Sequence, residues 1–361
     1  MKEAVIIGAG QTGRGFIAPI LQANDYHITF IDKKEKLITQ LKKEKAYTVR
    51  YFGDVKEAIQ VKDYEAHWIQ EEEIEDILAK ADLITISVFA GNIHELIEPL
   101  QKAAKKSEAK LRVICCENGV HVKQPLLDAL VPCSISEGVI FCTTLQPDME
   151  SLTLISEDVA ELPIDGSVEG IDMEIRGMPL EMDFSSLIQR KIYTYNFMSA
   201  IVAYVGDYLH YDVYGEAAND VIIKELMDRS VPIVSECIAK EYHITYEAQL
   251  AFTMRAVYKF RNKEIYDTIY RNARQAERKL KQEERLYEPL RLAKQYHQPI
   301  GYIVLTTAAA IHYAVDKEKA NLSHLIKTYE SLGVTKELEK VYELFKNQQP
   351  LQDILDFCAG F

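Results

Sequence analysis

A glycine-rich stretch near the start of the chain constrains its fold more than any other feature. The apolar run Ala4–Ile7 predicts a short strand buried on both faces, and Gly8-Ala9-Gly10-Gln11-Thr12-Gly13 follows it directly. Apolar residues recur at helical spacing behind the glycines, from Phe16 to Leu21. This order of strand, glycine-rich turn and helix predicts the first βαβ unit of a dinucleotide-binding domain. The alternative is a glycine-rich turn that packs but binds nothing.

Each glycine of this stretch has its own expected role. Gly8 allows the tight turn, Gly10 lets the backbone approach a pyrophosphate, and Gly13 lets helix and strand pack closely. Free backbone amides at the start of the helix attract phosphate charge. We therefore expect the whole stretch to bind the cofactor, a set that comprises Gly8, Ala9, Gly10, Gln11, Thr12 and Gly13.

An acidic residue ends the second predicted strand. Ile28–Ile31 is again a short apolar run, and Asp32 follows it about 20 residues after the glycines. A carboxylate there suits the two hydroxyls of an adenosine ribose and repels a 2′-phosphate, which favours NAD over NADP. Lys33 and Lys34 weaken this preference, since either side chain can bind such a phosphate.

Further strands and helices alternate along the first half of the chain. Strands are expected at Leu83–Val88, Leu111–Cys116 and Ile135–Cys142, with a helix from about Asn92 to Lys105. Short strand-like segments between Leu152 and Met178 should extend or flank the sheet.

The carboxyl ends of parallel strands line the ligand crevice of such a sheet. This places Glu117 and Asn118, which follow one of the expected strands, at the cofactor, with Asn118 beside the nicotinamide. The alternative for Asn118-Gly119 is an ordinary turn.

Strand signals fade beyond Asp183, and the rest of the chain is helical in pattern. A chain of 361 residues is also too long for one ordinary core. We therefore predict an α/β protein with two domains. Residues 1–182 form a Rossmann-type NAD-binding domain, and residues 183–361 form a mostly α-helical substrate and catalytic domain.

A lysine and an asparagine interrupt an apolar helical pattern that runs from Leu187 to Val205. At about 100° per residue, Lys191, Asn196 and Ser199 fall within an arc of about 140°, with Ser199 between the other two. A cation and an amide held against an apolar wall can take a hydroxyl proton or polarise a carbonyl. The alternative is a solvated lysine at the edge of an amphipathic helix.

A second polar cluster lies further along the helical half. Arg271, Arg274 and Arg278 follow i, i+3, i+7 spacing and should share one helix face, with Lys279 next to them. Guanidinium groups on one face can bind a phosphate ester through charge-assisted hydrogen bonds. The alternative is a solvated charged face that pairs with acidic neighbours, namely Glu277, Glu283 and Glu284.

Composition excludes several classes of partner. The net charge of −13 argues against general binding to nucleic acid or to an anionic membrane, which both reward a basic surface. No uncharged run reaches membrane-spanning length, and we expect a cytoplasmic protein without a signal peptide before the first strand. The cysteines show no metal-ligand spacing and are expected to be structural, without a metal site; they are Cys115, Cys116, Cys133, Cys142, Cys237 and Cys358.

Four stretches together resemble the polyol-specific long-chain dehydrogenases, the mannitol dehydrogenase family, and most closely its phosphate-specific branch. They occur in family order and nearly span the chain: Gly8–Phe16, Cys116–Asn118, Arg190–Asn196 and Arg274–Leu280, the last followed by Arg285–Leu290. The resemblance implies an NAD-linked oxidoreductase that needs no metal. It would transfer hydride between nicotinamide and a secondary alcohol or ketone of a polyol or sugar phosphate.

The same resemblance assigns roles to single residues. Lys191 matches the general base, and Asn196 and Asn118 match the amides that hold the reacting oxygen. The block from Arg274 to Lys279, including Arg278, matches a stretch of the phosphate-specific branch. The chemistry agrees, because a lysine serves as base near neutral pH only if burial or positive neighbours lower its pKa.

Two positions depart from the family pattern. Ser199 stands where the family has a histidine, and Thr143-Thr144 stands where the family has an aspartate-arginine pair before a proline. A serine can donate a hydrogen bond but does not titrate near neutral pH. The pattern therefore leaves two alternatives open: a dehydrogenase of an unphosphorylated polyol or hydroxy acid, and a non-catalytic NAD(H)-binding sensor.

Overall fold

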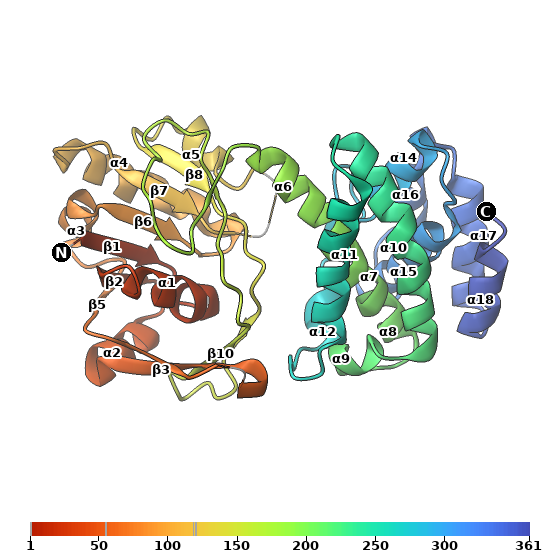
Figure 1. Ribbon diagram of the computed structural model, residues 1–361, viewed down its shortest axis with the longest axis horizontal. Helices are drawn as coiled ribbons and strands as arrows, with labels where there is room; N and C mark the ends of the chain where they lie inside the picture. The colour runs from red at the N-terminus through yellow and green to blue at the C-terminus, as the bar shows by residue number, and fades with distance from the viewer. Residues whose placement is uncertain (1, 55, 118, 120) are drawn as a thin grey trace. The chain divides into compact units, whose positions relative to one another are not determined.

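The computed structural model of the chain describes residues 2–54, 56–117, 119 and 121–361 (Figure 1). It divides into two compact units, Met1–Ser185 and Ser186–Phe361. The division lies close to residue 183, where the helical part of the chain was expected to begin.

The first unit is built on a six-stranded parallel sheet with the strand order β5-β2-β1-β6-β7-β8 (Figure 1). Its strands are β1 (Lys2–Ile7), β2 (Tyr26–Asp32), β5 (Glu65–Trp68), β6 (Leu83–Ile86), β7 (Arg112–Cys115) and β8 (Ser134–Glu137). This order is that of the Rossmann fold, with the reversal of strand order between β1 and β6. The predicted fold class is confirmed, although the strand expected at Ile135–Cys142 is shorter than its apolar pattern indicated.

Both faces of this sheet are covered, which explains the continuous apolar runs in its strands. Alternate residues of a strand point to opposite faces, and Ile6 lies in one buried cluster while Val5 and Ile7 lie in the other. The first cluster includes α1 (Ala18–Gln22) and α2 (Glu35–Glu44), and the second includes α3 (Ile74–Lys80) and α4 (Ile97–Lys106). The helix expected from Asn92 to Lys105 is thus α4, preceded by the 3₁₀ segment Ala90–Leu96.

Smaller sheets flank the main one. A four-stranded sheet has the order β4-β3-β10-β9, and a two-stranded sheet pairs β11 with β12. Their bounds are β3 (Ala46–Tyr51), β4 (Ile59–Lys62), β9 (Thr144–Leu145), β10 (Leu154–Ser156), β11 (Ile164–Asp165) and β12 (Leu180–Glu181). The strand-like pattern after Leu152 therefore forms separate sheets and does not extend the parallel one.

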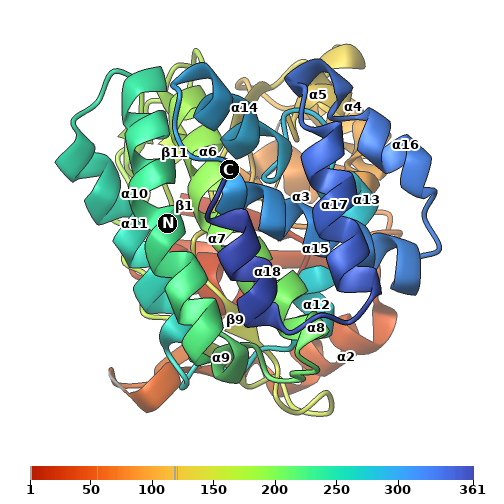
Figure 2. The ribbon, with the colours of Figure 1, turned by 90° about the vertical axis from the view of Figure 1, so that its right-hand side faces the viewer.

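The second unit consists of helices and their connecting loops (Figure 2). The bounds of its α-helices are α6 (Phe184–Lys191), α7 (Phe197–Ala200), α8 (Gly206–Tyr208), α9 (Tyr214–Ala217), α10 (Val221–Glu241), α11 (Tyr246–Arg261), α12 (Ile269–Ala273), α13 (Ala276–Lys279), α14 (Tyr287–Gln295), α15 (Gly301–Lys317), α16 (Leu322–Lys327), α17 (Thr335–Lys346) and α18 (Leu351–Cys358). Two π turns, η4 (Ile192–Asn196) and η5 (Ile201–Val205), join α6, α7 and α8 into one continuous helical segment.

The core of this unit surrounds α15, most of whose residues are buried. Helices α17 and α18 pack against it (Figure 2). A Cβ atom at Gly301 would lie 1.7 Å from the Cys358 carbonyl oxygen, so only glycine allows α15 to start this close to the end of α18.

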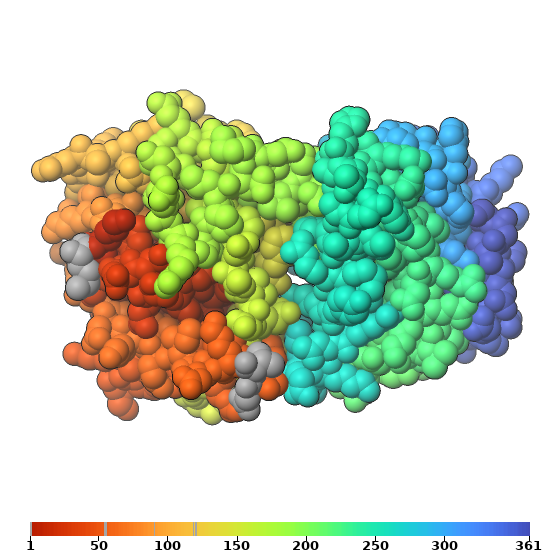
Figure 3. Space-filling model, in the orientation of Figure 1, coloured from red at the N-terminus to blue at the C-terminus, as the bar shows by residue number. Residues whose placement is uncertain are grey.

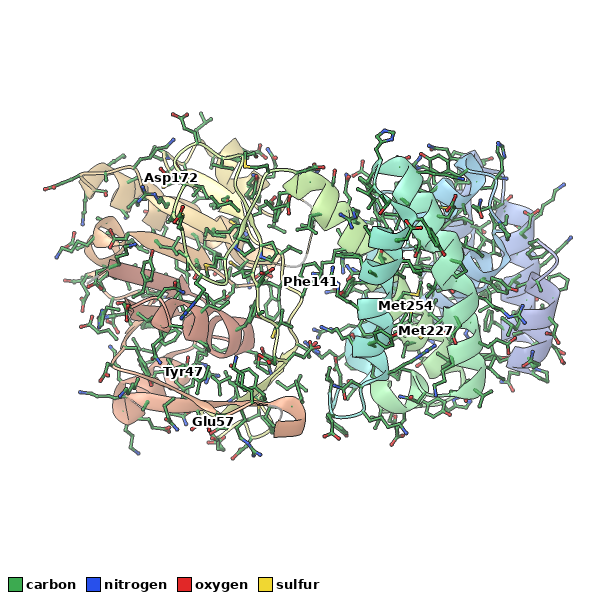
Figure 4. All side chains as sticks on the ribbon, in the orientation of Figure 1. Tyr47, Glu57, Phe141, Asp172, Met227 and Met254 are labelled. Atoms are coloured by element: carbon green, nitrogen blue, oxygen red, sulfur yellow. The ribbon has the colours of Figure 1, made fainter. Side chains whose placement is uncertain are left out.

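Helices α10 and α11 lie side by side and form much of the face of the second unit seen in Figure 3. They carry Met227 and Met254, which Figure 4 labels. Within the described ranges, none of the helices combines the length and the apolar character needed to cross a membrane.

Candidate active site

The turn after β1 has the geometry that its glycines predicted. Gly8 has φ +98°, and a Cβ atom there would lie 2.2 Å from the Ser87 carbonyl oxygen. A Cβ at Gly13 would lie 2.2 Å from the Gly8 carbonyl oxygen, so the helix packs directly on the turn. A Cβ at Gly10 would meet no described atom within 4 Å. The backbone at Gly10 is therefore open to a bulky group such as a pyrophosphate, and these residues fit a dinucleotide.

A buried arginine holds this turn in place. The Arg14 side chain is 1% exposed, and its Nε donates to the Ala9 carbonyl at 2.7 Å. Its Nη1 donates to the Leu152 carbonyl at 2.8 Å, and its Nη2 donates to Gln146 Oε1 at 3.0 Å. The guanidinium therefore holds the Ala9 carbonyl, within the glycine-rich turn, in a hydrogen bond. Arg14 was not among the residues predicted to have a role.

Tyr47 of β3, labelled in Figure 4, supports the same arginine. Its hydroxyl donates to the Arg14 carbonyl at 2.8 Å, and the guanidinium lies 5.6 Å from the centre of its ring. Both distances are those of favourable contacts. The first helical turn after the glycines is thus tied to the flanking four-stranded sheet.

Gln11 is directed toward that sheet as well. With its amide oriented to match donors and acceptors, the side chain donates to the Thr144 carbonyl at 3.0 Å and accepts from the Gln146 amide at 3.3 Å. The Thr144 hydroxyl pairs with the Ser156 hydroxyl at 2.6 Å across β9 and β10. Gln11 and the divergent Thr144 therefore tie the turn to the four-stranded sheet. That Gln11 and Thr12 bind the cofactor stays a prediction.

Asp32 lies at the carboxyl end of β2, as expected. Its Oδ1 accepts from the Lys34 backbone amide at 2.8 Å. Lys33 Nζ lies 3.0 Å from Glu95 Oε1, so this cation already has a carboxylate partner. One of the two lysines that weakened the preference for NAD is thereby less available to a 2′-phosphate.

Glu117 follows β7 and contacts the loop after β6. Its Oε1 accepts from the Phe89 backbone amide at 2.8 Å. Phe89 has φ +65° and a side chain that is 75% exposed, an unusual conformation for a bulky residue. Burial raises the pKa of Glu117 to about 7 against the opposing effect of this hydrogen bond. Asn118, predicted beside the nicotinamide, lies outside the described residues.

The predicted catalytic residues lie on the continuous helical segment that begins with α6. Lys191 is the last residue of α6, and Asn196 ends the π turn η4. The expected arc of about 140° between these side chains assumed a regular α-helix, and the π turn between them makes that expectation wrong. A π turn closes between residues five apart, which brings residues 191 and 196 about one turn from each other on the same side.

Lys191 has the properties of a base near neutral pH. Its side chain is buried, with 6% exposed. The pKa of its ammonium is lowered to about 7, first by burial and then by the positive charges of Lys259 and Arg285. The predicted alternative, a solvated lysine at a helix edge, is wrong.

Ser199 is half-buried and has a partner. The Tyr214 hydroxyl donates to Ser199 Oγ at 3.0 Å. Tyr214 itself is buried, and burial raises the pKa of its hydroxyl well above the ordinary value. The hydroxyl of Ser199 thus satisfies a buried donor, whereas Asn196 remains half-buried one turn away.

The predicted shared helix face of the late arginines is wrong. Helix α12 ends at Ala273, Arg274 has an extended ψ of 154°, and Gln275 has φ +62° before α13 begins. Arg278 pairs with Glu284 Oε1 at 2.5 Å, in agreement with the solvated alternative, and Arg274 is exposed. Whether Arg274 and Arg278 contact a phosphate stays a prediction.

Arg271 also pairs with a carboxylate, Asp267, at 2.6 Å. Lys279 differs from these exposed arginines, because it is 6% exposed and its Nζ donates to the Asn272 carbonyl. The pKa of Lys279 is lowered to about 7, first by burial and then by the positive charges of Arg285 and Arg278.

One group in the described chain combines a histidine with two acids, His67, Glu71 and Glu73. Their ligand atoms lie within 4.8 Å of one another, but Lys42 Nζ binds Glu71 at 2.7 Å and already supplies a cation. The group lies at the end of β5 and on the segment that follows it, and it contains none of the predicted catalytic residues.

Family models match both units of the chain. The mannitol dehydrogenase Rossmann domain matches residues 2–144, and the mannitol dehydrogenase C-terminal domain matches residues 183–354. Among curated relatives, the mannitol-1-phosphate 5-dehydrogenase of Caldanaerobacter subterraneus is 26% identical over 98% of this chain and 97% of its own. The enzyme of the same name from Lacticaseibacillus paracasei is 28% identical over 94% of each chain.

Solved structures share the fold at lower identity. D-sorbitol dehydrogenase in substrate-free form has a TM-score of 0.76 at 12% identity and covers 96% of this chain and 94% of its own. Pseudomonas fluorescens mannitol 2-dehydrogenase, solved with NAD and D-mannitol, has a TM-score of 0.66 at 13% identity and covers 87% and 79%. The chain therefore belongs to the mannitol dehydrogenase family, and its class is that of an NAD-dependent dehydrogenase acting on CH–OH groups.

Proposed function

We propose that this protein transfers hydride between the nicotinamide of NAD and a secondary alcohol or ketone of a polyol phosphate. The observation that carries the proposal is the burial of Lys191, which lowers the pKa of its ammonium to about 7. This lysine lies in the part of the chain that matches the mannitol dehydrogenase C-terminal domain. Curated relatives over nearly the whole chain are named mannitol-1-phosphate 5-dehydrogenase, which supports a phosphorylated substrate. The cytoplasmic location stays a prediction.

Lys191 acts as the general base of the proposed reaction. In the direction of oxidation, its neutral amine takes the hydroxyl proton while the carbon loses hydride, so the alcohol becomes a ketone. In reduction, the ammonium returns that proton to the oxygen. Because the pKa of Lys191 lies near 7, both forms are populated at neutral pH.

Asn196 is proposed to donate from its side-chain amide to the reacting oxygen. The π turn η4 brings it to the side of the helix on which Lys191 lies. An amide aimed at a developing alkoxide stabilises it, at about 3 kcal/mol for a single such donor in other enzymes. Asn118 is proposed as a second amide, on the basis of the family resemblance alone.

The first unit is proposed to hold the dinucleotide. When bound, NAD accepts the hydride at its nicotinamide ring. The amides from Gly10 to Gly13 would bind its pyrophosphate, and Asp32 would bind the ribose hydroxyls. Glu117 would contribute to cofactor binding indirectly, because its carboxylate accepts from the Phe89 amide and so holds the loop after β6.

A substrate panel tests the proposal. NADH oxidation is followed with fructose 6-phosphate, with fructose and with a 2-keto acid, for the native protein and for Lys191→Met. We expect turnover of the ketose phosphate that Lys191→Met abolishes. Turnover of fructose or of the keto acid alone would point to the unphosphorylated alternative. NADH binding without turnover of any substrate would overturn the proposal in favour of the sensor.

A further inference from the structure

A buried positive cluster lies beside α13, and the proposed chemistry does not use it. Lys279 is 6% exposed and the Arg285 side chain is 16% exposed. Burial is the largest cause that lowers the pKa of each, and the charge of Arg285 contributes to the lowered pKa of Lys279. Arg285 also contributes to the lowered pKa of Lys191. Arg285 is therefore electrostatically coupled both to the proposed base and to Lys279.

The carboxylates near this cluster already have hydrogen-bond or ion-pair partners. Glu284 divides its oxygens between Arg278 and Arg285, at 2.5 Å and 3.3 Å. Glu318 accepts from the Ala276 backbone amide at 2.9 Å and 3.1 Å, so it caps the start of α13. When Lys279 is protonated, the three cations Arg278, Arg285 and Lys279 outnumber the two carboxylates of Glu284 and Glu318. A buried charge without full compensation favours an anionic ligand.

A buried tyrosine lies next to Lys279. Tyr204 is 1% exposed, and within the described part of the chain its hydroxyl has no hydrogen-bond partner. Lys279 Nζ lies 5.7 Å from the centre of the Tyr204 ring. The charge of Arg285 also acts on this hydroxyl. Buried hydroxyls are almost always satisfied, so this hydroxyl still has a hydrogen bond to donate, and a ligand oxygen would supply the acceptor.

We propose that Lys279, Arg285 and the Tyr204 hydroxyl form the subsite for the phosphate group of a sugar or polyol phosphate. The inference rests on the proposed function and names the residues that recognise its substrate. A phosphate suits this set because it offers several strong acceptor oxygens to an ammonium, a guanidinium and a hydroxyl. The subsite differs from the one expected from the sequence, since it excludes the exposed Arg274 and uses Arg285.

Binding of a dianion has a consequence for protons. A phosphate at this subsite offsets the positive charge that acts on Lys279 and Lys191, so it raises the pKa of both. Near pH 8 the free protein holds Lys279 largely neutral, and the bound complex holds it protonated. Phosphate binding should therefore take up a proton from solvent.

Kinetics of variants test the subsite. The test variants are Lys279→Met, Arg285→Met and Tyr204→Phe, and the matched control is Lys281→Met, which removes an exposed lysine from the same segment. We expect the two charge removals to raise KM for fructose 6-phosphate about tenfold or more and Tyr204→Phe to raise it severalfold. KM for fructose should change less than twofold in all of them. Equal KM changes for the two sugars would overturn the subsite.

Tyr204→Phe separates recognition from folding. If the hydroxyl has only a structural role, its removal deletes an unsatisfied buried group, so the melting temperature rises and KM stays constant. The subsite requires a higher KM for the phosphorylated sugar whatever the change in melting temperature. Constant KM would remove Tyr204 from the subsite and overturn the proposal as stated.

Calorimetry keeps the test independent of turnover. Fructose 6-phosphate and inorganic phosphate are titrated at pH 8 in two buffers of different ionisation enthalpy. We expect proton uptake with the native protein and loss of that uptake in Lys279→Met. Such binding without NADH oxidation would refute the proposed function and leave the subsite standing. NADH oxidation with native KM values in all three variants would refute the subsite and leave the function standing.

Discussion

Lys191 and Asn196 stand at the two ends of a single π turn. In a regular α-helix two residues five apart point about 140° from each other, whereas a π turn returns the chain to the same side after five residues. π turns are rare and cost helical regularity, and they are frequent at functional sites. This one brings a buried lysine and a half-buried asparagine to one side of the helix.

The first prediction concerns the pH dependence of the two reaction directions. Oxidation of the alcohol needs neutral Lys191, so its rate should rise about tenfold per pH unit up to about pH 7 and then level off. Reduction needs the protonated form, and its rate should fall above the same pH. Lys191→Met should lower kcat/KM by about 10²- to 10⁴-fold and remove both dependences. Steady-state rates from pH 5.5 to 9 in each direction measure this.

Lys327→Met is the matched control, since this lysine is exposed on α16 in the same unit. It should leave both pH profiles unchanged. A native pH profile that persists in Lys191→Met would contradict the role of this residue as base.

Arg14 provides a second prediction, on cofactor affinity. Arg14→Lys keeps a charge but cannot reach the three acceptors that the guanidinium holds, so the Ala9 carbonyl is released. We expect NADH to bind about tenfold more weakly and the protein to lose about 1–3 kcal/mol of unfolding free energy, because buried acceptors lose their partner. Fluorescence titration with NADH and chemical unfolding measure the two effects.

Arg176→Lys serves as the control for Arg14, because Arg176 is exposed and donates its side chain to one carbonyl, that of Ala23. Titration with ADP-ribose and with adenosine locates the defect. Weaker binding of ADP-ribose with unchanged binding of adenosine supports a defect at the pyrophosphate. Equal losses for both ligands would argue against this role for Arg14.

The third prediction separates Ser199 from the chemistry. Its hydroxyl accepts from the buried hydroxyl of Tyr214 at 3.0 Å, and Ser199→Ala leaves that donor only the Ser199 backbone carbonyl at 3.5 Å, so the change should cost about 1 kcal/mol of stability. We expect kcat/KM to change less than about threefold at a temperature where the variant is folded. The double variant Ser199→Ala with Tyr214→Phe should recover part of the stability. A large loss of kcat at unchanged stability would instead make Ser199 a catalytic residue.

The first half of the fold was predictable because its signals are local. The strands around Gly8–Gly13 are short apolar runs, and the glycines, the helix and Asp32 follow within one βαβ unit. The role of Arg14 was not predictable, since its acceptors at Gln146 and Leu152 lie more than 130 residues away in sequence. No periodicity along the chain reports such a contact.

The second half shows where a regular helical period misleads. The arc expected for Lys191 and Asn196 assumed 3.6 residues per turn, and the sequence carries no signal for the π turn between them. The prediction that the late arginines share one helix face was wrong for a similar reason. Gln275 adopts a left-handed conformation that ends the helical pattern, and no glycine in the sequence indicates it. Arg285, close enough to Lys191 to lower its pKa, lies 94 residues away in sequence and was identified only by its burial and charge.

The last prediction concerns Glu117 and stability. The pKa of this carboxyl is raised from 4.5 to about 7 by burial, so between these values the folded protein holds a proton that the unfolded chain has lost. Its contribution to stability is therefore full below about pH 4.5 and is lost as the pH rises through 7, a difference of about 3 kcal/mol.

Glu117→Gln imitates the protonated form and keeps an oxygen for the Phe89 amide. Without cofactor, the unfolding free energy of the native protein should fall more between pH 5 and 8 than that of Glu117→Gln. The exposed Glu161→Gln should follow the native curve, and parallel curves for all three proteins would show that Glu117 is ionised in the folded state throughout this range.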